Sequence, residues 1–549
     1  MRISLPGWRG IDVAMVMAGM KNKTEILPYT WMVAAVSALV AAVALGFVRI
    51  GGNMSTTFGP IDDHEPASWI GNRDRLPLSD YFSTLFSQTE IGQFGEFARY
   101  RPSYYAVRVF GAVVFGNNST AWYAMVGIVY VATIALFSFV TWLWLQRALN
   151  LSRPKWSTGL AIAAPVIGAL LFGSMNPWIG VTARLGPSEL WASLGLALAL
   201  FGMTQLVFSV STWWWVPTLL GSWLATMAKE NYLPFVIAVV VTGLWRFIEY
   251  RKKLDLVLAL ISLLPALLVG VAIFSYTGVS GSDVYGNEVG TARLSSAVLS
   301  LVTTLILHWL PAVILLVGAL LALSISRLTG LASRVILAWV FLTIGLTWLF
   351  FDAVVYNGVY ALPRYEMVFY TLKLLALIAA LAIGLFTARK ASNLIPRVFS
   401  LSVVVGCLVI GLSQLIAVPD STLQMRTEVE ENRLAVQKWQ DGLSEVRRLI
   451  GLSQTESVLV VVDRGVDLEP MVALLEEIKR FQPGLDVFVT RGPNLDAGSG
   501  EGVFISGLSQ NELESMNGTP DVCILLNTET TGILGCSSQS SVSVFAREM

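Results

Sequence analysis

Charged residues are scarce in this chain of 549 residues: Asp, Glu, Lys and Arg make up 13% of it, whereas hydrophobic residues make up 55%. Soluble domains carry about a quarter charged residues. Together with a mean hydropathy of +0.65, this scarcity excludes a soluble domain with one large core and indicates a polytopic membrane protein. The formal net charge is zero, so the sequence gives no indication of a nucleic-acid partner.

Cysteine is also rare, and its spacing matches no zinc or redox motif. Cys407 falls in an apolar run, and Cys523 and Cys536 fall in the polar C-terminal region. A disulfide between the last two and a pair of free thiols are both compatible with the sequence. A phosphate-binding glycine loop is lacking as well, because the glycine-rich residues 492–502 are more typical of a flexible turn.

Long apolar runs take the place of charge along most of the chain. At a rise of about 1.5 Å per residue, about 20 apolar residues cross a hydrocarbon core of about 30 Å. We therefore expect an α-helical polytopic membrane protein. The sequence predicts about eleven transmembrane helices, at residues 30–50, 119–146, 157–174, 188–209, 212–228, 232–249, 255–276, 303–325, 333–352, 367–388 and 397–418.

Lys and Arg in the short loops predict the orientation of the chain. The N-terminal segment is not a convincing signal peptide, because its apolar stretch is short and no small-residue cleavage site follows it. With eleven spans, this segment falls on the same side as the basic loops that contain Arg147, Arg246, Arg327 and Arg389. The sequence therefore predicts a multi-pass protein of the bacterial cytoplasmic (inner) membrane, with a cytoplasmic N-terminus and an extracytoplasmic C-terminus.

Three further parts of the chain have a predicted structure. The membrane domain, residues 1–418, has a long first external loop at 51–118, whose mixture of aromatic and polar residues predicts short helices on the membrane surface. Residues 419–452 are charged, with apolar residues at helical spacing, and predict a helical linker. Residues 453–549 alternate strand-like and helical runs, which predicts a small extracytoplasmic α/β domain.

Ionisable and aromatic residues collect at the predicted outer ends of the spans. The first external loop opens with an acidic motif of Asp62, Asp63, His64 and Glu65. The rest of this loop and the other outer segments carry Arg99, Arg101, Tyr104, Tyr105, Trp178, Arg184, Glu189, Lys229, Glu230, Arg364 and Tyr365. Ionisable groups at membrane depth are costly and usually serve a function. This set predicts a concave site for a polar substrate that bears a phosphate.

Simpler interpretations exist for single residues. Asp62 and Asp63 also fit solvated loop acids or a helix N-cap, although their crowding in one motif favours a functional role. Lys229 and Arg364 also fit interfacial anchors. Lys373 lies inside the tenth predicted span, about two helical turns from Arg364. A charge in that position needs a partner or a phosphate.

Together these motifs resemble the GT-C class of membrane glycosyltransferases, which includes bacterial relatives of protein O-mannosyltransferases and lipid A aminoarabinose transferases. The resemblance covers roughly residues 30–418, and it is carried by IDDHE (61–65), RYRPSYYAVRVFGAVVFG (99–116), KENYLP (229–234) and PRYEM (363–367). It implies a polyprenyl-phosphate sugar donor that is used at the outer face of the membrane. The acceptor would be a hydroxyl group of a glycan, a lipid or a protein.

The resemblance also implies roles for particular residues. An acid of the first loop acts on the acceptor hydroxyl, and this role falls on Asp62 or Asp63. We favour Asp62, because in this class the first acid of such a pair is more often the reactive one. Glu189 and Glu230 are the candidates for a second acid from a later external loop. Basic residues would bind the donor phosphate, and the candidates are Arg364, Lys373, Lys229, Arg99 and Arg101.

The chemistry of such a site follows from its residue types. A carboxylate takes the proton of the acceptor hydroxyl during attack, and cationic side chains stabilise the departing lipid phosphate. With a single base, direct displacement inverts the anomeric carbon. We expect no required cofactor, although His64 with Asp63 is compatible with a divalent metal. Substrate contacts are expected from His64, Glu65, Tyr104, Tyr105, Trp178, Arg184, Glu189, Glu230 and Tyr365.

Two other functions fit parts of the pattern. A polymerase or ligase of lipid-linked glycans tends to place its key arginines in a large late external loop, whereas here the first external loop is the longest. A non-enzymatic transporter usually shows internal repeats and polar or broken helices near mid-membrane, whereas here the ionisable groups gather at one face. The leading hypothesis is therefore glycosyl transfer, with the sugar donor, the acceptor and membrane lipid as partners.

Overall fold

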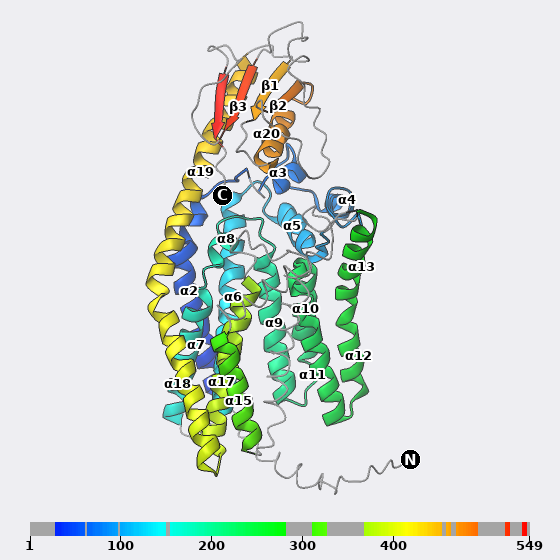
Figure 1. Cartoon of the computed structure of the whole chain (residues 1–549). Helices are drawn as coiled ribbons and strands as arrows, with labels where there is room; N and C mark the ends of the chain where they lie inside the picture. Colours follow the sequence, from blue (N-terminus) through cyan, green and yellow to red (C-terminus); the bar gives the residue numbers. More distant parts are fainter. Residues whose placement is uncertain are drawn as a thin grey trace.

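The computed structural model describes residues 28–60, 63–96, 99–149, 154–280, 310–326, 367–452, 457–462, 468–491, 522–527 and 541–545. In this part of the chain, eight helices are long and apolar enough to cross a membrane. Such helices satisfy their backbone hydrogen bonds internally, as a hydrocarbon environment requires. The protein is therefore a polytopic helical membrane protein, and its long helices run side by side in one bundle (Figure 1).

The helices of the bundle follow the predicted spans closely. In chain order they are α2 (Pro28–Ile50), α6 (Ser119–Leu149), α7 (Pro154–Gly173), α9 (Glu189–Phe208), α10 (Trp215–Ala228), α11 (Phe235–Tyr250), α12 (Lys253–Ile261), α13 (Leu263–Ser280), α15 (Leu310–Ile325), α17 (Met367–Lys390) and α18 (Leu394–Ile416). Eight of the eleven predicted spans correspond to the membrane-length helices.

Four of the predicted spans need further description. The span at 212–228 corresponds to α10, which has 14 residues, and residues 310–325 of the span at 303–325 form α15, whereas residues 303–309 lie outside the described residues. The predicted span 333–352 lies outside the described residues. The span 255–276 is divided into α12 and α13, because Pro265 in the first turn of α13 has no N–H to donate to the preceding turn.

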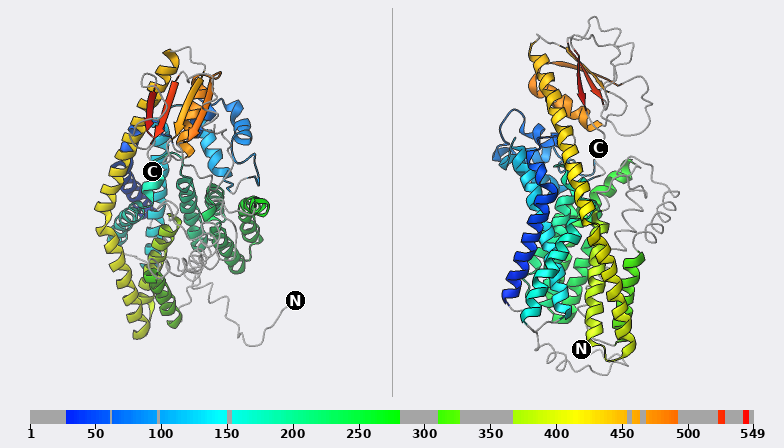
Figure 2. Two further views of the ribbon diagram at one scale, coloured as in Figure 1. Left: turned by 45° about the horizontal axis from the view of Figure 1, so that its top comes forward. Right: turned by 90° about the vertical axis from the view of Figure 1, so that its left-hand side faces the viewer.

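The segments that join the helices gather at two ends of the bundle (Figures 1 and 2). One end, which we refer to as the loop end, carries residues 51–118, 174–188 and 229–234, and a small sheet lies beyond it. The opposite end, the basic end, carries the connections that contain Lys155 and Arg251. The side of the membrane that each end faces stays a prediction.

Short helices build the loop end, as the composition of residues 51–118 predicts. They are η1 (Gly51–Ser55), α3 (His64–Ile70), η2 (Leu78–Asp80), α4 (Tyr81–Ser87), α5 (Pro102–Val114), α8 (Trp178–Thr182) and η3 (Glu230–Tyr232). Pro102 suits the start of α5, since the first helical N–H has no intrahelical partner. Tyr104, Tyr105 and Arg108 are buried at helical spacing, so α5 packs one face against the bundle.

A close contact between backbones joins α9 and α10. A Cβ atom at Gly195 would lie 2.4 Å from the backbone nitrogen of Ala225, and one at Gly221 would lie 2.4 Å from that of Ala199. These distances leave no room for a side chain. Small residues of this kind let helices approach closely in membranes, where the hydrophobic effect contributes little to helix association.

A buried ion pair holds the turn between α9 and α10. Arg246 of α11 and Asp255 of α12 are fully buried, with 3.0 Å between Nε and Oδ1. The Arg246 guanidinium also donates to the carbonyls of Ser209 (2.6 Å) and Val210 (3.3 Å), and the Trp215 indole donates to Asp255 at 2.7 Å. The use of Arg246 as a loop charge in the orientation argument was wrong, because a charge within the bundle is retained only with partners of this kind.

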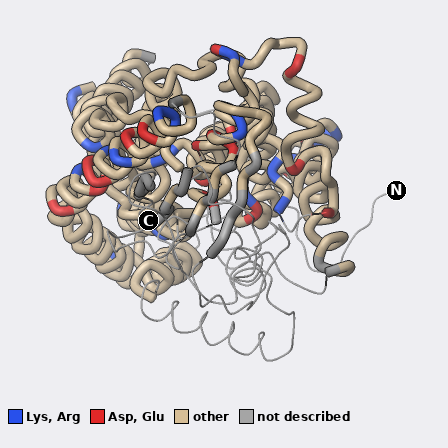
Figure 3. Tube along the Cα trace, turned by 90° about the horizontal axis from the view of Figure 1, so that it is seen from above, with Lys and Arg blue, Asp and Glu red and all other residues tan. Residues whose placement is uncertain are grey.

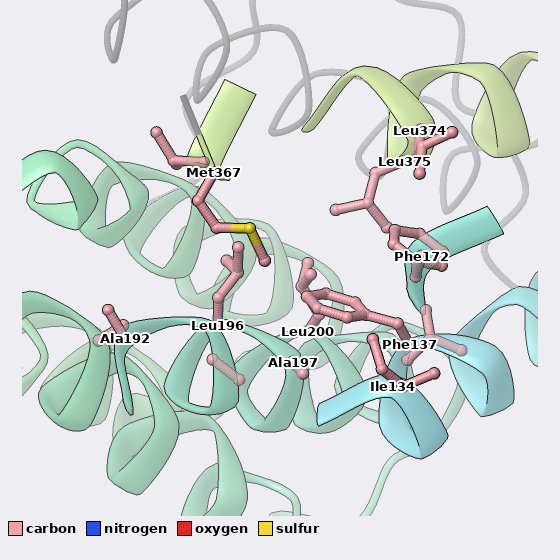
Figure 4. Close-up of a cluster of buried hydrophobic side chains, with 14 of the residues drawn as sticks. Ile134, Phe137, Phe172, Ala192, Leu196, Ala197, Leu200, Met367, Leu374 and Leu375 are labelled. Atoms are coloured by element: carbon pink, nitrogen blue, oxygen red, sulfur yellow. The ribbon is translucent and has the colours of Figure 1, made fainter. Parts of the chain in front are cut away.

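The core of the bundle lies among α6, α7, α9 and α17. The rings of Phe137 and Phe172 stack with centroids 4.7 Å apart, and Met367 reaches toward Leu196 (Figure 4). All four side chains are at most 1% exposed. Since a core at this density resists displacement, these contacts hold the start of α17 in place against α9.

A single helix, α19 (Val418–Leu452), connects the bundle to the sheet. It follows α18 after one residue and rises along the flank of the bundle (Figure 2). With 35 residues, it is about 52 Å long at about 1.5 Å per residue. Its buried residues recur at spacings of four and three: Met425, Val429, Asn432, Val436, Trp439, Leu443, Val446 and Ile450. An average spacing of about 3.5 residues keeps this stripe on one face of the helix.

Hydrogen bonds join the first two thirds of α19 to the loop end. The Ser421 hydroxyl donates to the Ser174 carbonyl at 2.6 Å, and the Asn432 amide donates to the Ala183 carbonyl at 2.7 Å. Further along, the Gln440 amide donates to the Phe58 carbonyl at 2.7 Å. These bonds join α19 to two separate connections of the bundle.

The C-terminal half of the stripe packs against the sheet. Four parallel strands in the order β2-β1-β3-β4 form it: β1 (Ser457–Val462), β2 (Asp486–Arg491), β3 (Val522–Asn527) and β4 (Ser541–Phe545). Val458 and Val460 lie on one face of β1 and share a core with Leu443 of α19 and Leu474 of α20 (Leu468–Phe481). The first three strands and α20 fall where the sequence pattern places them. That residues 453–549 form an independent α/β domain stays a prediction.

We expect Gly221→Ala to destabilise the bundle, because its methyl group would overlap the backbone of α9. Overpacking of this kind costs about 1–3 kcal/mol. Gly159→Ala is the matched control: a Cβ there meets nothing within 4 Å, and Ala favours a helix over Gly by up to about 1 kcal/mol. Thermal unfolding in detergent measures both variants. Equal midpoints for the two variants would contradict the close contact.

Candidate functional site

The residues predicted to form the site lie mainly at the loop end. Seen from this end, Lys and Arg positions are interspersed with Asp and Glu positions rather than separated by sign (Figure 3). Asp62, Arg364 and Tyr365 lie outside the described residues. Most of the others fall into three groups: a fixed aspartate, a chain of contacts on α5 and a buried network of ion pairs. Arg184, Lys373 and Trp178 lie outside these groups.

Asp63 is the fixed aspartate, at 1% exposed. Its Oδ2 accepts hydrogen bonds from the Gly59 backbone N–H (3.0 Å) and the Tyr123 hydroxyl (3.1 Å), and its Oδ1 accepts one from the Leu185 backbone N–H (3.1 Å). It occupies the N-cap position of α3 but makes no capping bond. Its side chain therefore holds the first loop, α6 and the segment before α9 together, which is a positioning role.

The second group is a chain of contacts that runs from α3 through α5. Arg108 forms an ion pair with Glu65 and donates a hydrogen bond to the Tyr104 hydroxyl, which in turn donates to the Gly186 carbonyl. The Arg108 guanidinium also lies 5.8 Å from the centroid of the Trp69 ring. These contacts attach the acidic motif to the same segment before α9 that Asp63 reaches.

Sequence reasoning missed Arg108, although a signal was present. Arg101, Tyr104, Tyr105 and Arg108 follow one another at helical spacing, which places them on one face of a helix. Tyr105 is 7% exposed and its ring packs edge-on against those of Tyr104 and Trp69. Burial raises the pKa of the Tyr105 phenol well above its ordinary value. Tyr105 is thus a packing residue in this structure.

The third group is a network of four buried charges. Arg101 contacts both carboxylate oxygens of Glu230, at 3.1 and 3.2 Å. Lys229 lies 3.1 Å from Glu189 Oε1 and 3.5 Å from Glu230 Oε1. Each of these side chains is at most 10% exposed. Buried charges are tolerated when they are paired in this way, so the interpretation of Lys229 as an interfacial anchor is wrong.

The network changes the roles that these residues can take. Arg101 and Lys229 would have to leave carboxylate partners before binding a donor phosphate, and Glu189 and Glu230 already accept contacts from cations. Their geometry favours a structural role that braces α5, α9 and η3. Arg99, half-buried beside this group, takes part in its electrostatics through Glu90 and Glu230.

Glu90 is a second residue that sequence reasoning missed. It follows α4 in the first loop, and its Oε2 atom is buried without a hydrogen-bond partner. Burial raises the pKa of the Glu90 carboxyl to about 7, against the opposing effect of Arg101 and Arg99. A carboxyl group that titrates near neutral pH is suited to proton transfer. In the sequence, Glu90 lies in a stretch for which we predicted only short helices on the membrane surface, so it was not selected as a site residue.

Two cations of the predicted site have no carboxylate partner in the described part of the chain. Arg184 is half-buried, lies next to the Asp63-bound Leu185 and interacts electrostatically with Tyr123. Lys373 is half-buried on α17, one and a half turns beyond Met367 at about 3.6 residues per turn. These two cations are better placed to bind an anion than Arg101 or Lys229.

Trp178 is the predicted contact residue that fits a substrate least. It is 0% exposed, its indole N–H donates to the Phe172 carbonyl at 2.7 Å, and its ring packs edge-on against Tyr130. A side chain with no accessible surface cannot line a site in this conformation. Trp178 is therefore part of the core.

The sequence predicts no required cofactor and is compatible with a divalent metal at His64 and Asp63, and both statements stay predictions. Within the described ranges, no group of three or more His, Cys, Asp or Glu side chains is arranged to hold a metal ion. Both oxygens of Asp63 face the donors described above, and His64 lies in the first turn of α3. Both alternatives for Cys523 and Cys536, a disulfide and two free thiols, stay open, because Cys536 lies outside the described residues.

No protein-family model matches this chain, and no curated protein is significantly similar to it. The fold and the site define a polytopic helical membrane protein with a paired, charge-rich cluster at one end of its bundle. Any assignment of function therefore depends on the geometry of the loop end and on the motifs of the sequence.

We expect Glu90→Gln to alter the pH dependence of stability. Because the folded protein raises the pKa of this carboxyl from 4.5 to about 7, the stability that depends on its neutral form is complete below pH 4.5 and is lost as the pH rises through 7. As the pH rises from 4.5 to 7, the wild-type protein should lose about 3 kcal/mol of unfolding free energy relative to the variant, which has no carboxyl group at this position. Thermal midpoints of both proteins across this range measure the loss, and parallel pH profiles would contradict it.

Proposed function

We propose that this protein is a membrane glycosyltransferase of the GT-C type, which transfers a sugar from a polyprenyl-phosphate donor to an acceptor hydroxyl. The observation that carries the proposal is the hydrogen bond from Leu185 to Asp63, at 3.1 Å. It joins the acidic motif to the segment that carries Arg184. Asp63 of this motif and a cation that has no carboxylate partner among the described residues are thereby brought to one place at the loop end.

The base in this mechanism is Asp62. Asp63 uses both carboxylate oxygens to accept hydrogen bonds, and Asp62 is its covalent neighbour, with Cα atoms about 3.8 Å apart. As the acceptor hydroxyl attacks the anomeric carbon, its proton passes to the Asp62 carboxylate. The bond between that carbon and the phosphate oxygen breaks, and the configuration of the carbon inverts.

Cations stabilise the leaving group in this mechanism. The departing lipid phosphate carries the electron pair of the broken bond and its negative charge, which Arg184 and Lys373 are available to stabilise. Glu90 replaces Glu189 and Glu230 as the candidate second acid, because those two contact Lys229 and Arg101. No step of this mechanism requires a metal ion.

The proposal includes a location. The basic connections lie at the end of the bundle opposite the site, and by the positive-inside tendency this supports a location of the site and the small sheet outside the cytoplasmic membrane. A donor lipid embedded in the bilayer then reaches the loop end laterally. Residues 453–549 are, in this proposal, an extracytoplasmic α/β domain.

Separate exchange of the two aspartates tests the base. We expect Asp62→Asn to lower transfer from a panel of polyprenyl-phosphate sugars by about 10²- to 10⁴-fold, with an unchanged thermal midpoint. Asp63→Asn should instead lower the midpoint, because its NH₂ group must face at least one of three donors, at a cost of about 1–3 kcal/mol. Full transfer by both variants would exclude an aspartate base in this motif.

Arg184→Ala tests the phosphate site. Loss of the guanidinium should raise KM for the donor by about tenfold or more, since a hydrogen bond to a charged group contributes about 1.5–3 kcal/mol. KM for the acceptor should stay unchanged. Arg433→Ala is the matched control, because Arg433 is an exposed arginine of α19 that pairs with Glu430. Equal donor KM values for the two variants would exclude Arg184 from donor binding.

A further inference from the structure

A cavity of about 350 Å³ lies where the first loop, α19 and α20 meet. Its walls include Phe58 and His64 of the first loop, Trp439 and Gln440 of α19, and Glu476 of α20. At about 30 Å³ per water molecule it has room for roughly a dozen waters, and it falls at the small end of the range of about 300–1,000 Å³ typical of ligand pockets.

The walls of this cavity are held by hydrogen bonds between segments far apart in the chain. The Gln440 amide donates to the Phe58 carbonyl at 2.7 Å, which joins α19 to the first loop. The Arg480 guanidinium donates to the Asn72 side chain at 3.2 Å, and the Asn72 amide donates to the Arg480 carbonyl at 3.3 Å, which joins α20 to the end of α3. The cavity is therefore preorganised by three elements.

The two carboxyl groups in the wall of the cavity, Glu476 and Glu477, differ in the partners that they contact. Glu477 pairs with Arg447 at 2.6 Å and with Arg480 at 3.4 Å. Glu476 has no such partner in the described part of the chain, and its Oε2 atom is buried without a hydrogen bond. Burial raises the pKa of the Glu476 carboxyl to about 7, with smaller effects from Glu65 and Glu477. In its protonated form this group both donates and accepts hydrogen bonds.

These features identify the chemistry of the ligand. The lining carries Glu476 and Glu477 together with Lys479 and Arg480, so it has no surplus of positive charge to attract the phosphate of the donor headgroup. Phe58, Trp439 and Leu443 supply apolar surface, while Gln440 and Glu476 supply polar atoms at the edges. A sugar ring presents apolar C–H faces and a rim of hydroxyl groups, and it is uncharged. The cavity matches such a neutral ligand in both size and chemistry.

We propose that this cavity binds a neutral sugar unit of the acceptor, with the Glu476 carboxyl hydrogen-bonded to a ring hydroxyl. The inference rests on the proposed function, which it deepens by making the acceptor a glycan and by giving α20 a role. His64 lines the cavity and belongs to the same acidic motif as Asp62 and Asp63. A glycan bound here contacts the acidic motif at His64.

The test uses the full-length protein in lipid nanodiscs with photoreactive mannotriose and glucotriose as probes, in the absence of donor. We expect one of these probes to crosslink to residues of the cavity walls. Ser68→Trp should abolish this binding, because Ser68 lines the cavity at an exposed position. Ser444→Trp, at an exposed position of α19 that does not line the cavity, is the matched control and should bind as the wild type does.

A second variant probes the carboxyl directly. Glu476→Leu should weaken probe binding by about tenfold, the effect of one lost hydrogen bond to a ligand, because Leu has neither donor nor acceptor. Thermal midpoints equal to that of the wild type show that Ser68→Trp and Glu476→Leu are folded. Crosslinks away from the cavity, or unchanged affinity in both folded variants, would overturn the inference.

The same measurements separate this inference from the proposed function. Probe binding needs no catalysis, so it should persist in Asp62→Asn. Cavity-dependent binding without transfer from any donor would support the sugar site and refute the transferase. Transfer that continues with an unchanged acceptor KM in Ser68→Trp would support the transferase and refute the sugar site.

Discussion

The buried stripe of α19 is the constraint on which the arrangement of the loop end depends. Because its spacing averages about 3.5 residues, one helix packs first against the bundle through Met425 and Val429 and then against the sheet through Leu443 and Ile450. It continues α18 almost directly, so the sheet is positioned by a helix that is anchored in the bundle. The cavity next to Gln440 exists because this helix meets the first loop and α20 at the same height.

Some charged residues of the loop end join segments of the structure, and others are available to act on a ligand. Asp63, with its three donors, and the pairs Arg101–Glu230 and Lys229–Glu189 join segments that are distant in the chain, and their charges are satisfied by one another. Glu90, Arg184 and Glu476 differ, because none has a carboxylate or cation in contact within the described residues. Groups left without partners in a well-packed framework are those best suited to bind and transform a ligand.

The sequence predicted the helices well and the roles of their charged residues less well. The span at 255–276 was found, but its division at Pro265 was not, because apolar composition hides a break in hydrogen bonding. Arg246 was assigned to a loop from its position near Arg251, whereas Asp255 and a set of carbonyls hold it inside the bundle. Arg108 was detectable from its helical spacing to Arg101 and Tyr104. Glu90 was not, since its burial results from neighbours that only the fold provides.

The sequence by itself determined that this is a membrane protein, where most of its helices lie and that its acidic motif shares one end of the bundle with several cations. These properties are local or additive: about 20 consecutive apolar residues make a span whatever the rest of the chain does, and counting spans assigns each connection to an end. Only the tertiary structure decided which charges are satisfied. Asp63 bonds to a backbone N–H 122 positions away, and α20 meets the first loop across about 400 residues, as the bond between Asn72 and Arg480 shows. Partners at such separations are selected by packing, and no spacing in the sequence records them.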